Sequence, residues 1–166
     1  MNIIAQTLRM IIREFLPEEL ETYLTHFTDD EVARYLPKRS RDERIVIFNN
    51  ALSQYLTTKA TGIWGIFDNA TGEFIGSCLL RPFNDEPGIL EVGYSMEKKY
   101  WGRGIGTEMA LAMITHGFAD INITEIVACT TFENVASQRV LQKAGLKPVE
   151  NLIRNGEELA FFRLKR

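Results

Sequence analysis

The sequence has 166 residues, of which 45% are hydrophobic and 25% are charged, and its formal net charge is −3. This length and balance predict a single globular domain over residues 1–166, whose core needs neither disulfides nor metals. Arg39, Arg41 and Arg44 fall close together, but Asp42 and Glu43 lie among them. Because binding to a nucleic acid backbone requires a dominant positive surface, nucleic acid is excluded as the main partner.

The two cysteines, Cys78 and Cys129, lie in apolar, strand-like runs and form no CxxC pair. They are predicted to be reduced thiols of the core. The two histidines, His26 and His116, fall in helical segments that nothing in the sequence brings to a cysteine, so a catalytic thiol is not indicated, and no metal site is expected. No secretory signal and no apolar run of membrane-spanning length is present. The sequence therefore predicts a cytoplasmic protein with no membrane partner.

The first third of the chain predicts one strand followed by two helices. Alternating apolar residues favour a strand over Thr7–Phe15. Pro17 then opens a helical pattern. Ser40 and Glu43 have the form of a capping box, and apolar residues recur at helical spacing from there to about Lys59.

The middle third has strand character. Gly62–Asp68 and Glu73–Pro82 are predicted strands, and the turn Asn69–Gly72 between them indicates a hairpin. Ile89–Met96 is a further predicted strand. Its even-numbered residues share one face, and Glu91, Gly93 and Ser95 share the other.

The last third alternates helices and strands. The hairpin signal Asn155-Gly156 lies between its two final strands. The predicted elements are a buried helix (Thr107–Ile121), a strand (Thr124–Thr131), a helix capped by Asn134 and stopped by Gly145 (Asn134–Ala144), and two strands (Leu146–Ile153, Glu158–Leu164). The whole order predicts an α+β (mixed α/β) domain, with about seven strands in a mixed sheet and about four helices packed on it.

A glycine turn, Trp101–Thr107 (WGRGIGT), joins the strand Ile89–Met96 to the next helix. Its amides and the positive end of the helix dipole predict an anion site of the kind that holds phosphate groups. The amides that could contact phosphate oxygens are those of Gly102, Arg103, Gly104, Ile105, Gly106 and Thr107.

Two other phosphate-binding motifs are excluded. A dinucleotide fingerprint needs a third glycine where Thr107 stands, and a Walker A loop needs a lysine that WGRGIGT lacks. A tight turn that only packs the helix on the sheet remains an equal alternative for the isolated motif.

Three polar residues elsewhere are candidates for chemistry. Asn134 is first a helix cap, whereas Ser137 points to the buried side of its helix and needs a protein or ligand partner. Glu91 lies in an apolar strand and is either a solvated or paired charge or a general base. The second role suits acyl transfer to an amine, because a carboxylate in a partly dry cleft has a raised pKa and can accept the amine's proton.

The runs ILEVGYSMEKKYWGRGIGTEMA and FENVASQRVLQKAGL together resemble the GNAT N-acetyltransferase superfamily, closest to its ribosomal-protein N-acetyltransferase (Rim-type) branch. The openings TLRMIIREFLPEELETYL and DDEVARYLP also resemble that branch, so the resemblance covers essentially the whole chain. It implies a sheet that splays open between the fourth and fifth strands, with acetyl-CoA in the opening.

The resemblance also assigns roles to residues. Backbone groups of Tyr94 and Met96 would pair with the pantetheine arm, residues 102–107 would hold the pyrophosphate, and Asn134 would touch the cofactor. Glu91 would be the base and Ser137 the acid. The helix that begins at Asn134 lacks the tyrosine that many members use as acid, which leaves Ser137 or water for that role.

The expected activity is direct transfer of an acetyl group from acetyl-CoA to a primary amine, with a protein N-terminal amine as one acceptor. A small-molecule amine, such as a polyamine, an aminoglycoside or a metabolite, is an alternative acceptor. A non-catalytic acyl-CoA-binding module and a structural domain are alternatives to an enzyme. A homodimer is among the assemblies that the sequence allows.

Overall fold

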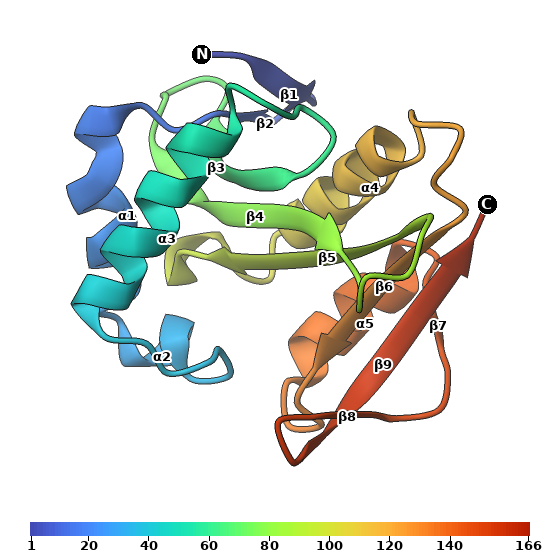
Figure 1. Cartoon of the computed structure of the whole chain (residues 1–166). Coiled ribbons are helices and arrows are strands. Elements are labelled where there is room, and N and C mark those ends of the chain that lie inside the picture. Colours follow the sequence, from blue (N-terminus) through green and yellow to red (C-terminus); the bar gives the residue numbers. More distant parts are fainter.

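Nine strands form one connected sheet in the computed structural model, which describes residues 1–166 (Figure 1). The strand order is β1-β2-β3-β4-β5-β6-β9-β7, and β8 pairs with β9. The strands are β1 (Ile3–Gln6), β2 (Met10–Arg13), β3 (Gly62–Asp68), β4 (Phe74–Pro82), β5 (Ile89–Met96), β6 (Glu125–Thr130), β7 (Lys147–Pro148), β8 (Leu152–Arg154) and β9 (Glu157–Lys165). All neighbouring pairs are antiparallel except β5 and β6, so the sheet is mixed, as predicted.

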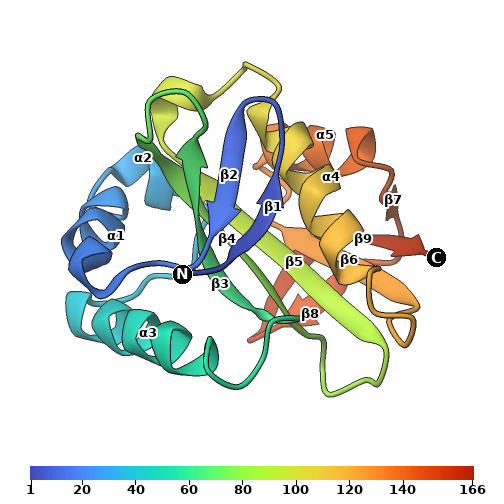
Figure 2. The same ribbon diagram turned by 90° about the horizontal axis from the view of Figure 1, so that it is seen from above.

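The chain has five α-helices, four of which pack on the two faces of the sheet. They are α1 (Leu20–His26), α2 (Asp30–Ala33), α3 (Arg41–Gln54), α4 (Ile105–Gly117) and α5 (Val135–Lys143), with 3-10 turns at Pro17–Glu19 and Lys98–Tyr100. Figure 2 shows α1 and α3 on one face and α4 and α5 on the other. No helix of the chain combines the length and the hydropathy that a membrane crossing requires.

Each face of the sheet has its own core. The α4 face carries the larger cluster, which includes Trp64, Met109 and Phe162, each at most 1% exposed. The α1 face carries a smaller cluster that is mostly aromatic, formed by Phe15, Tyr23, Leu24, Phe48 and Phe67. The sheet is therefore fixed by packing on both sides, and its strands can hold polar groups at defined positions.

The two extra strands arise because predicted strands divide at both ends of the chain. The single strand predicted over Thr7–Phe15 is wrong: β1 and β2 form a hairpin, and Thr7 lies in its turn, where its N–H donates to Met10 O at 2.9 Å. The predicted strand Leu146–Ile153 divides into β7 and β8. The fifth helix, α2, is a single turn that the sequence pattern did not separate from the loop around it.

Local signals predicted the other elements correctly. Ser40 Oγ accepts from Glu43 N at 3.2 Å and Glu43 Oε2 accepts from Ser40 N at 2.6 Å, which confirms the capping box of α3. Asn155 and Gly156 have φ values of 51° and 78°, as a tight hairpin between β8 and β9 requires.

The sheet opens between β5 and β6. These strands pair in parallel only over Ile89–Glu91 and Glu125–Val127, although β5 continues to Met96 and β6 to Thr130. Figure 1 shows β6 and β9 turned away from β4 and β5. The predicted opening between the fourth and fifth strands is thus confirmed, and we call the unpaired parts, residues 92–96 and 128–130, the walls of the gap.

Candidate active site

Along β5, the backbone N–H and C=O groups of successive residues point alternately toward β4 and toward the gap. Glu97 donates its N–H to the backbone of β4 at 2.7 Å, which fixes the odd-numbered residues of β5 as those bonded to β4. The backbone groups of Val92, Tyr94 and Met96 therefore point to the opposite side, into the gap. The indole Nε1 of Trp101 donates to Met96 O at 2.9 Å, so this carbonyl oxygen already has a partner. An extended ligand can pair with the remaining groups as a strand would.

The glycine turn ends beside the gap and presents six free amides. None of the N–H groups of residues 102–107 donates a hydrogen bond within the protein. They lie at the N-terminus of α4, where the helix dipole adds positive potential. Consecutive free amides at a helix start form a concave anion site, so a pyrophosphate fits the residues present.

The glycines of the turn divide between two roles. Gly102 and Gly104 have φ values of 69° and 75°, which residues other than glycine rarely adopt. A Cβ at Gly106 would lie 2.9 Å from Met96 Cε and 3.2 Å from Val140 Cγ2. Gly106 therefore packs α4 against β5 and α5, as the packing alternative required, whereas Gly102 and Gly104 shape the free amides.

Arg9, in the turn between β1 and β2, braces this loop. Its Nη1 donates to Arg103 O at 2.7 Å and its Nε donates to Glu108 Oε2 at 2.6 Å. The sequence carries no signal for this contact, because 94 positions separate Arg9 from Arg103. Arg9 fixes the carbonyl side of the glycine turn and leaves the amides free.

Asn134 and Ser137 lie at the start of α5, across the gap from β5. Asn134 Oδ1 accepts from Ser137 N at 3.2 Å, so Asn134 is the predicted cap. Ser137 Oγ lies 3.0 Å from Tyr94 Oη, so its partner is a protein hydroxyl. Burial raises the pKa of Tyr94 to about 12, although the hydrogen bond with Ser137 lowers it, so the phenol is protonated at neutral pH. No pattern in the sequence indicated the pairing of Tyr94 with Ser137. Tyr94 thus brings a tyrosine hydroxyl from β5 to α5, which has no tyrosine of its own.

Glu91 is buried, with 6% of its surface exposed, and both of its carboxylate oxygens are bonded. Arg154 from β8 donates to Oε1 at 2.7 Å and to Oε2 at 3.1 Å. Arg81 from β4 donates to Oε2 at 3.0 Å. Burial alone would raise the pKa of Glu91, but the hydrogen bonds and charges of Arg154 and Arg81 outweigh it and lower the pKa. The raised pKa predicted for Glu91 is therefore wrong, and the paired-charge alternative describes its surroundings.

The pairing of Glu91 predicts a pH-dependent contribution to stability. A lowered pKa stabilises the folded protein above the ordinary glutamate value near 4.5, and this contribution is lost as the pH falls through the folded-state pKa. We expect Glu91→Gln to lower the free energy of unfolding by about 2 kcal/mol at neutral pH, since Arg81 is half exposed and remains partly solvated.

Urea unfolding of both proteins at neutral and acidic pH measures this contribution. The difference between wild type and variant should shrink below about pH 4. The matched control is Glu21→Gln, which breaks an exposed pair with Arg41 and should change stability by less than about 0.5 kcal/mol. An equal difference at all pH values would show that Glu91 does not titrate with a lowered pKa.

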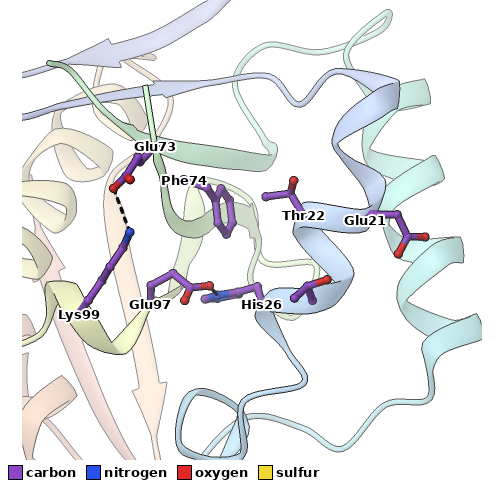
Figure 3. Close-up of a pocket in the computed structure, with 8 residues that line it drawn as sticks. Glu21, Thr22, His26, Glu73, Phe74, Glu97 and Lys99 are labelled. Carbon is purple, nitrogen blue, oxygen red and sulfur yellow. Dashed lines mark hydrogen bonds and ion pairs between the residues drawn. The ribbon is translucent and has the colours of Figure 1, made fainter. Parts of the chain in front are cut away.

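A cavity of about 500 Å³ opens on the α1 face, at the C-terminal end of β5 (Figure 3). His26 of α1 lies at its base and contacts Glu97, and Glu73 is paired with Lys99 on the opposite wall. Its lining is otherwise polar except for Phe74. The helical position predicted for His26 is confirmed, but its partners were not evident from the sequence.

Both cysteines are free thiols. Cys78 is buried, and burial raises its pKa. Cys129 Sγ lies 3.3 Å from Glu91 Oε1, and burial, followed by the charge of Glu91, raises its pKa to about 12. Both thiols are therefore protonated at neutral pH. Cys78 lies in the core, as predicted, whereas Cys129 is only half-buried.

Comparisons with known proteins agree on one family. A family model described as the acetyltransferase (GNAT) domain matches residues 9–147. The chain is 27% identical to the uncharacterized N-acetyltransferase YoaA of Bacillus subtilis over 146 aligned residues. The alignment covers 87% of this chain and 82% of YoaA.

Two solved structures share the fold over nearly the whole chain. A GNAT-family acetyltransferase from Bacillus anthracis superposes with a TM-score of 0.82 at 19% identity, over 99% of this chain and 98% of the other. The ribosomal-protein acetyltransferase RimL, solved in complex with coenzyme A, superposes with a TM-score of 0.82 at 16% identity, over the same 99% and 98%. With its mixed sheet open between β5 and β6, the chain belongs to the GNAT family of acetyltransferases, enzymes that use acetyl-CoA.

Proposed function

We propose that this protein transfers the acetyl group of acetyl-CoA directly to a primary amine. The observation that carries the proposal is the row of free amides at residues 102–107, beside a gap whose β5 wall presents unpaired backbone groups. The amides would hold the pyrophosphate, with Arg103 and Thr107 adding side-chain contacts. The backbone groups of Tyr94 and the N–H of Met96, whose carbonyl is bonded to Trp101, would pair with the pantetheine arm, and Asn134 would lie near it.

Bound acetyl-CoA supplies an activated acyl group on a good leaving thiolate. A gap-facing backbone N–H of β5, in the Tyr94–Met96 region, would donate to the thioester carbonyl oxygen and stabilise the negative charge that develops there. Ser137 would donate a proton to the departing sulfur, with Tyr94 donating in turn to Ser137. Orientation of the two substrates on a rigid sheet would supply much of the rate.

Glu91 has a role other than the general base that the sequence predicted. Because two arginines occupy its carboxylate, it is a poor acceptor for the proton of an incoming ammonium group. It instead ties β5 to β8 through Arg154 and so fixes the final hairpin against the sheet. We propose this positioning role for Glu91 in place of a base.

The test is acetyl-CoA turnover against a panel of peptide N-termini, polyamines and aminoglycosides, with released thiol as the readout and mass spectrometry of the acceptor as confirmation. We expect release at least about 10-fold above the amine-free rate for one acceptor class, together with thermal stabilisation by acetyl-CoA. Stabilisation without turnover on any amine would instead identify an acyl-CoA-binding module. Absence of both would identify a structural domain.

A further inference from the structure

His26 forms the centre of a chain of polar groups on the α1 face. Its side chain has no exposed surface, and its ring lies edge-on against Phe27 and Phe74. Both ring nitrogens are nevertheless bonded: Nε2 lies 2.8 Å from Ser95 Oγ, and Nδ1 lies 2.8 Å from Glu97 Oε1. A hydroxyl, an imidazole and a carboxylate therefore stand in line, an order that in enzymes moves protons.

Ser95 and Glu97, the two ends of this hydrogen-bonded series, lie in different parts of the protein. Ser95 belongs to the part of β5 that has no partner on its β6 side, on the face opposite to Tyr94 and Met96. Glu97 is 32% exposed and lines the cavity of Figure 3. The hydrogen-bonded series thus runs from Ser95 in the wall of the gap, through the fully buried ring of His26, to Glu97, which is in contact with solvent.

We infer that Ser95, His26 and Glu97 form a proton relay that deprotonates the acceptor amine. This inference rests on the proposed function, because it assigns the base that Glu91 cannot supply. Ser95 is the group that touches the amine, His26 accepts the proton, and Glu97 holds the ring and returns the proton to solvent.

The proton balance of the relay is simple. The acceptor ammonium gives one proton to Ser95 Oγ as the hydroxyl proton of Ser95 moves to Nε2 of His26. The tautomer required has its hydrogen on Nδ1, where Nδ1 donates to Glu97. The neutral amine then attacks the thioester, so that an N–C bond forms and the C–S bond breaks. Ser137 protonates the departing coenzyme A sulfur, and the second proton of the amine restores the proton that the Ser137–Tyr94 pair has given up. The first proton leaves the imidazolium of His26 through Glu97.

Charged groups from three neighbouring segments act on His26: Glu97 after β5, Asp29 before α2 and Arg44 from α3. The hydroxyl of Ser95 bonds the ring directly, and Ser77 Oγ on β4 lies 3.5 Å from Ser95 Oγ. Burial lowers the pKa of His26, and this outweighs Glu97, which raises it. The ring is therefore neutral at physiological pH and can accept a proton.

The first experiment is the pH dependence of kcat with a saturating amine. Because only the neutral ring accepts, kcat should fall with decreasing pH through a transition centred below 6.5. Ser95→Ala and His26→Gln should each lower kcat about 10-fold at neutral pH and recover near about pH 9, where more of the amine is already neutral. Glu97→Gln should keep the high-pH plateau and move the transition about 1 pH unit lower, since the imidazolium loses its counter-charge.

The matched control is Glu31→Gln, which removes another partly exposed carboxylate of this region that contacts Lys98 and does not touch His26. Its pH profile should coincide with that of the wild type. Thermal unfolding of each variant separates a folding defect from a defect in the relay. An unchanged profile in Glu97→Gln, or wild-type kcat in Ser95→Ala, would overturn the relay and leave the acetyltransferase intact.

A second measurement does not depend on turnover. His26 and His116 are the only histidines, so NMR titration of the His116→Gln variant reports His26 alone. We expect titration below 6.5 and a further decrease on Glu97→Gln. If no amine is acetylated, the proposed function fails, whereas a normal His26 titration in an active enzyme contradicts only the relay. An acetyl group found on Ser95 after incubation with acetyl-CoA would make Ser95 a nucleophile and also overturn the relay.

Discussion

Replacing Gly104 by valine is expected to weaken acetyl-CoA binding by about 100-fold, which corresponds to about 2.7 kcal/mol. Gly104 has a φ of 75°, and a β-branched residue is a strained outlier in that region. The turn must then change conformation, and its amides no longer converge on one anion. Isothermal calorimetry with acetyl-CoA measures the loss directly.

Gly145→Val is the matched control for this substitution. Gly145 also has a positive φ, 99°, and a Cβ there would meet no atom within 4 Å, but it follows the end of α5, away from the glycine turn. Both variants should lower the melting temperature, because both force a side chain into the left-handed region. Only Gly104→Val should lose affinity, and near-wild-type affinity in that variant would remove residues 102–107 as the pyrophosphate site.

The second large effect is expected for Tyr94→Phe, which should lower kcat by about 100-fold while leaving acetyl-CoA affinity nearly unchanged. The substitution removes the Tyr94 hydroxyl, which lies 3.0 Å from Ser137 Oγ, and leaves the Ser137 hydroxyl without a protein partner. In the proposed mechanism, the proton that Ser137 would give to the departing coenzyme A sulfur would then no longer be replaced from Tyr94. Steady-state kinetics with the acceptor found in the panel provide the measurement.

A double-mutant cycle decides whether the two hydroxyls act as one unit. If they do, Ser137→Ala alone and Ser137→Ala with Tyr94→Phe should show similar losses in kcat, because each breaks the same path. Losses that multiply would contradict a shared path. Tyr55→Phe is the control, since it removes a partly buried hydroxyl that donates to Ile63 O on β3, two strands away from β5, and its kcat should match the wild type.

Local patterns predicted the framework of the cofactor side. The alternation in Ile89–Met96, the glycine turn and the cap at Asn134 are each encoded within a few residues, and the structure contains all three. The opening between β5 and β6 followed from the family resemblance. The strand, the turn and the cap are predictable because neighbouring residues determine their backbone geometry.

The partners of the chemical groups were not predictable in the same way. Glu91 is 63 positions from Arg154, and Ser95 is 69 positions from His26. A strand pattern shows which face a residue occupies, but tertiary packing decides what stands opposite. For this reason the sequence identified Glu91 as unusual but led to the wrong pKa direction, and the hydroxyl pair of Tyr94 and Ser137 was missed.

The gap between β5 and β6 also bears on how the free protein behaves in solution. Two stretches of unpaired backbone face each other there, and unpaired strand edges are templates for pairing with other chains. Charged side chains and prolines usually blunt such edges, but β5 between Val92 and Met96 carries neither. The helices α4 and α5 instead cover these strands on one face of the sheet, α4 against β5 and α5 against β6. A ligand that fills the gap would remove the exposed edges, so occupancy would guard this enzyme against self-association as well as support its catalysis.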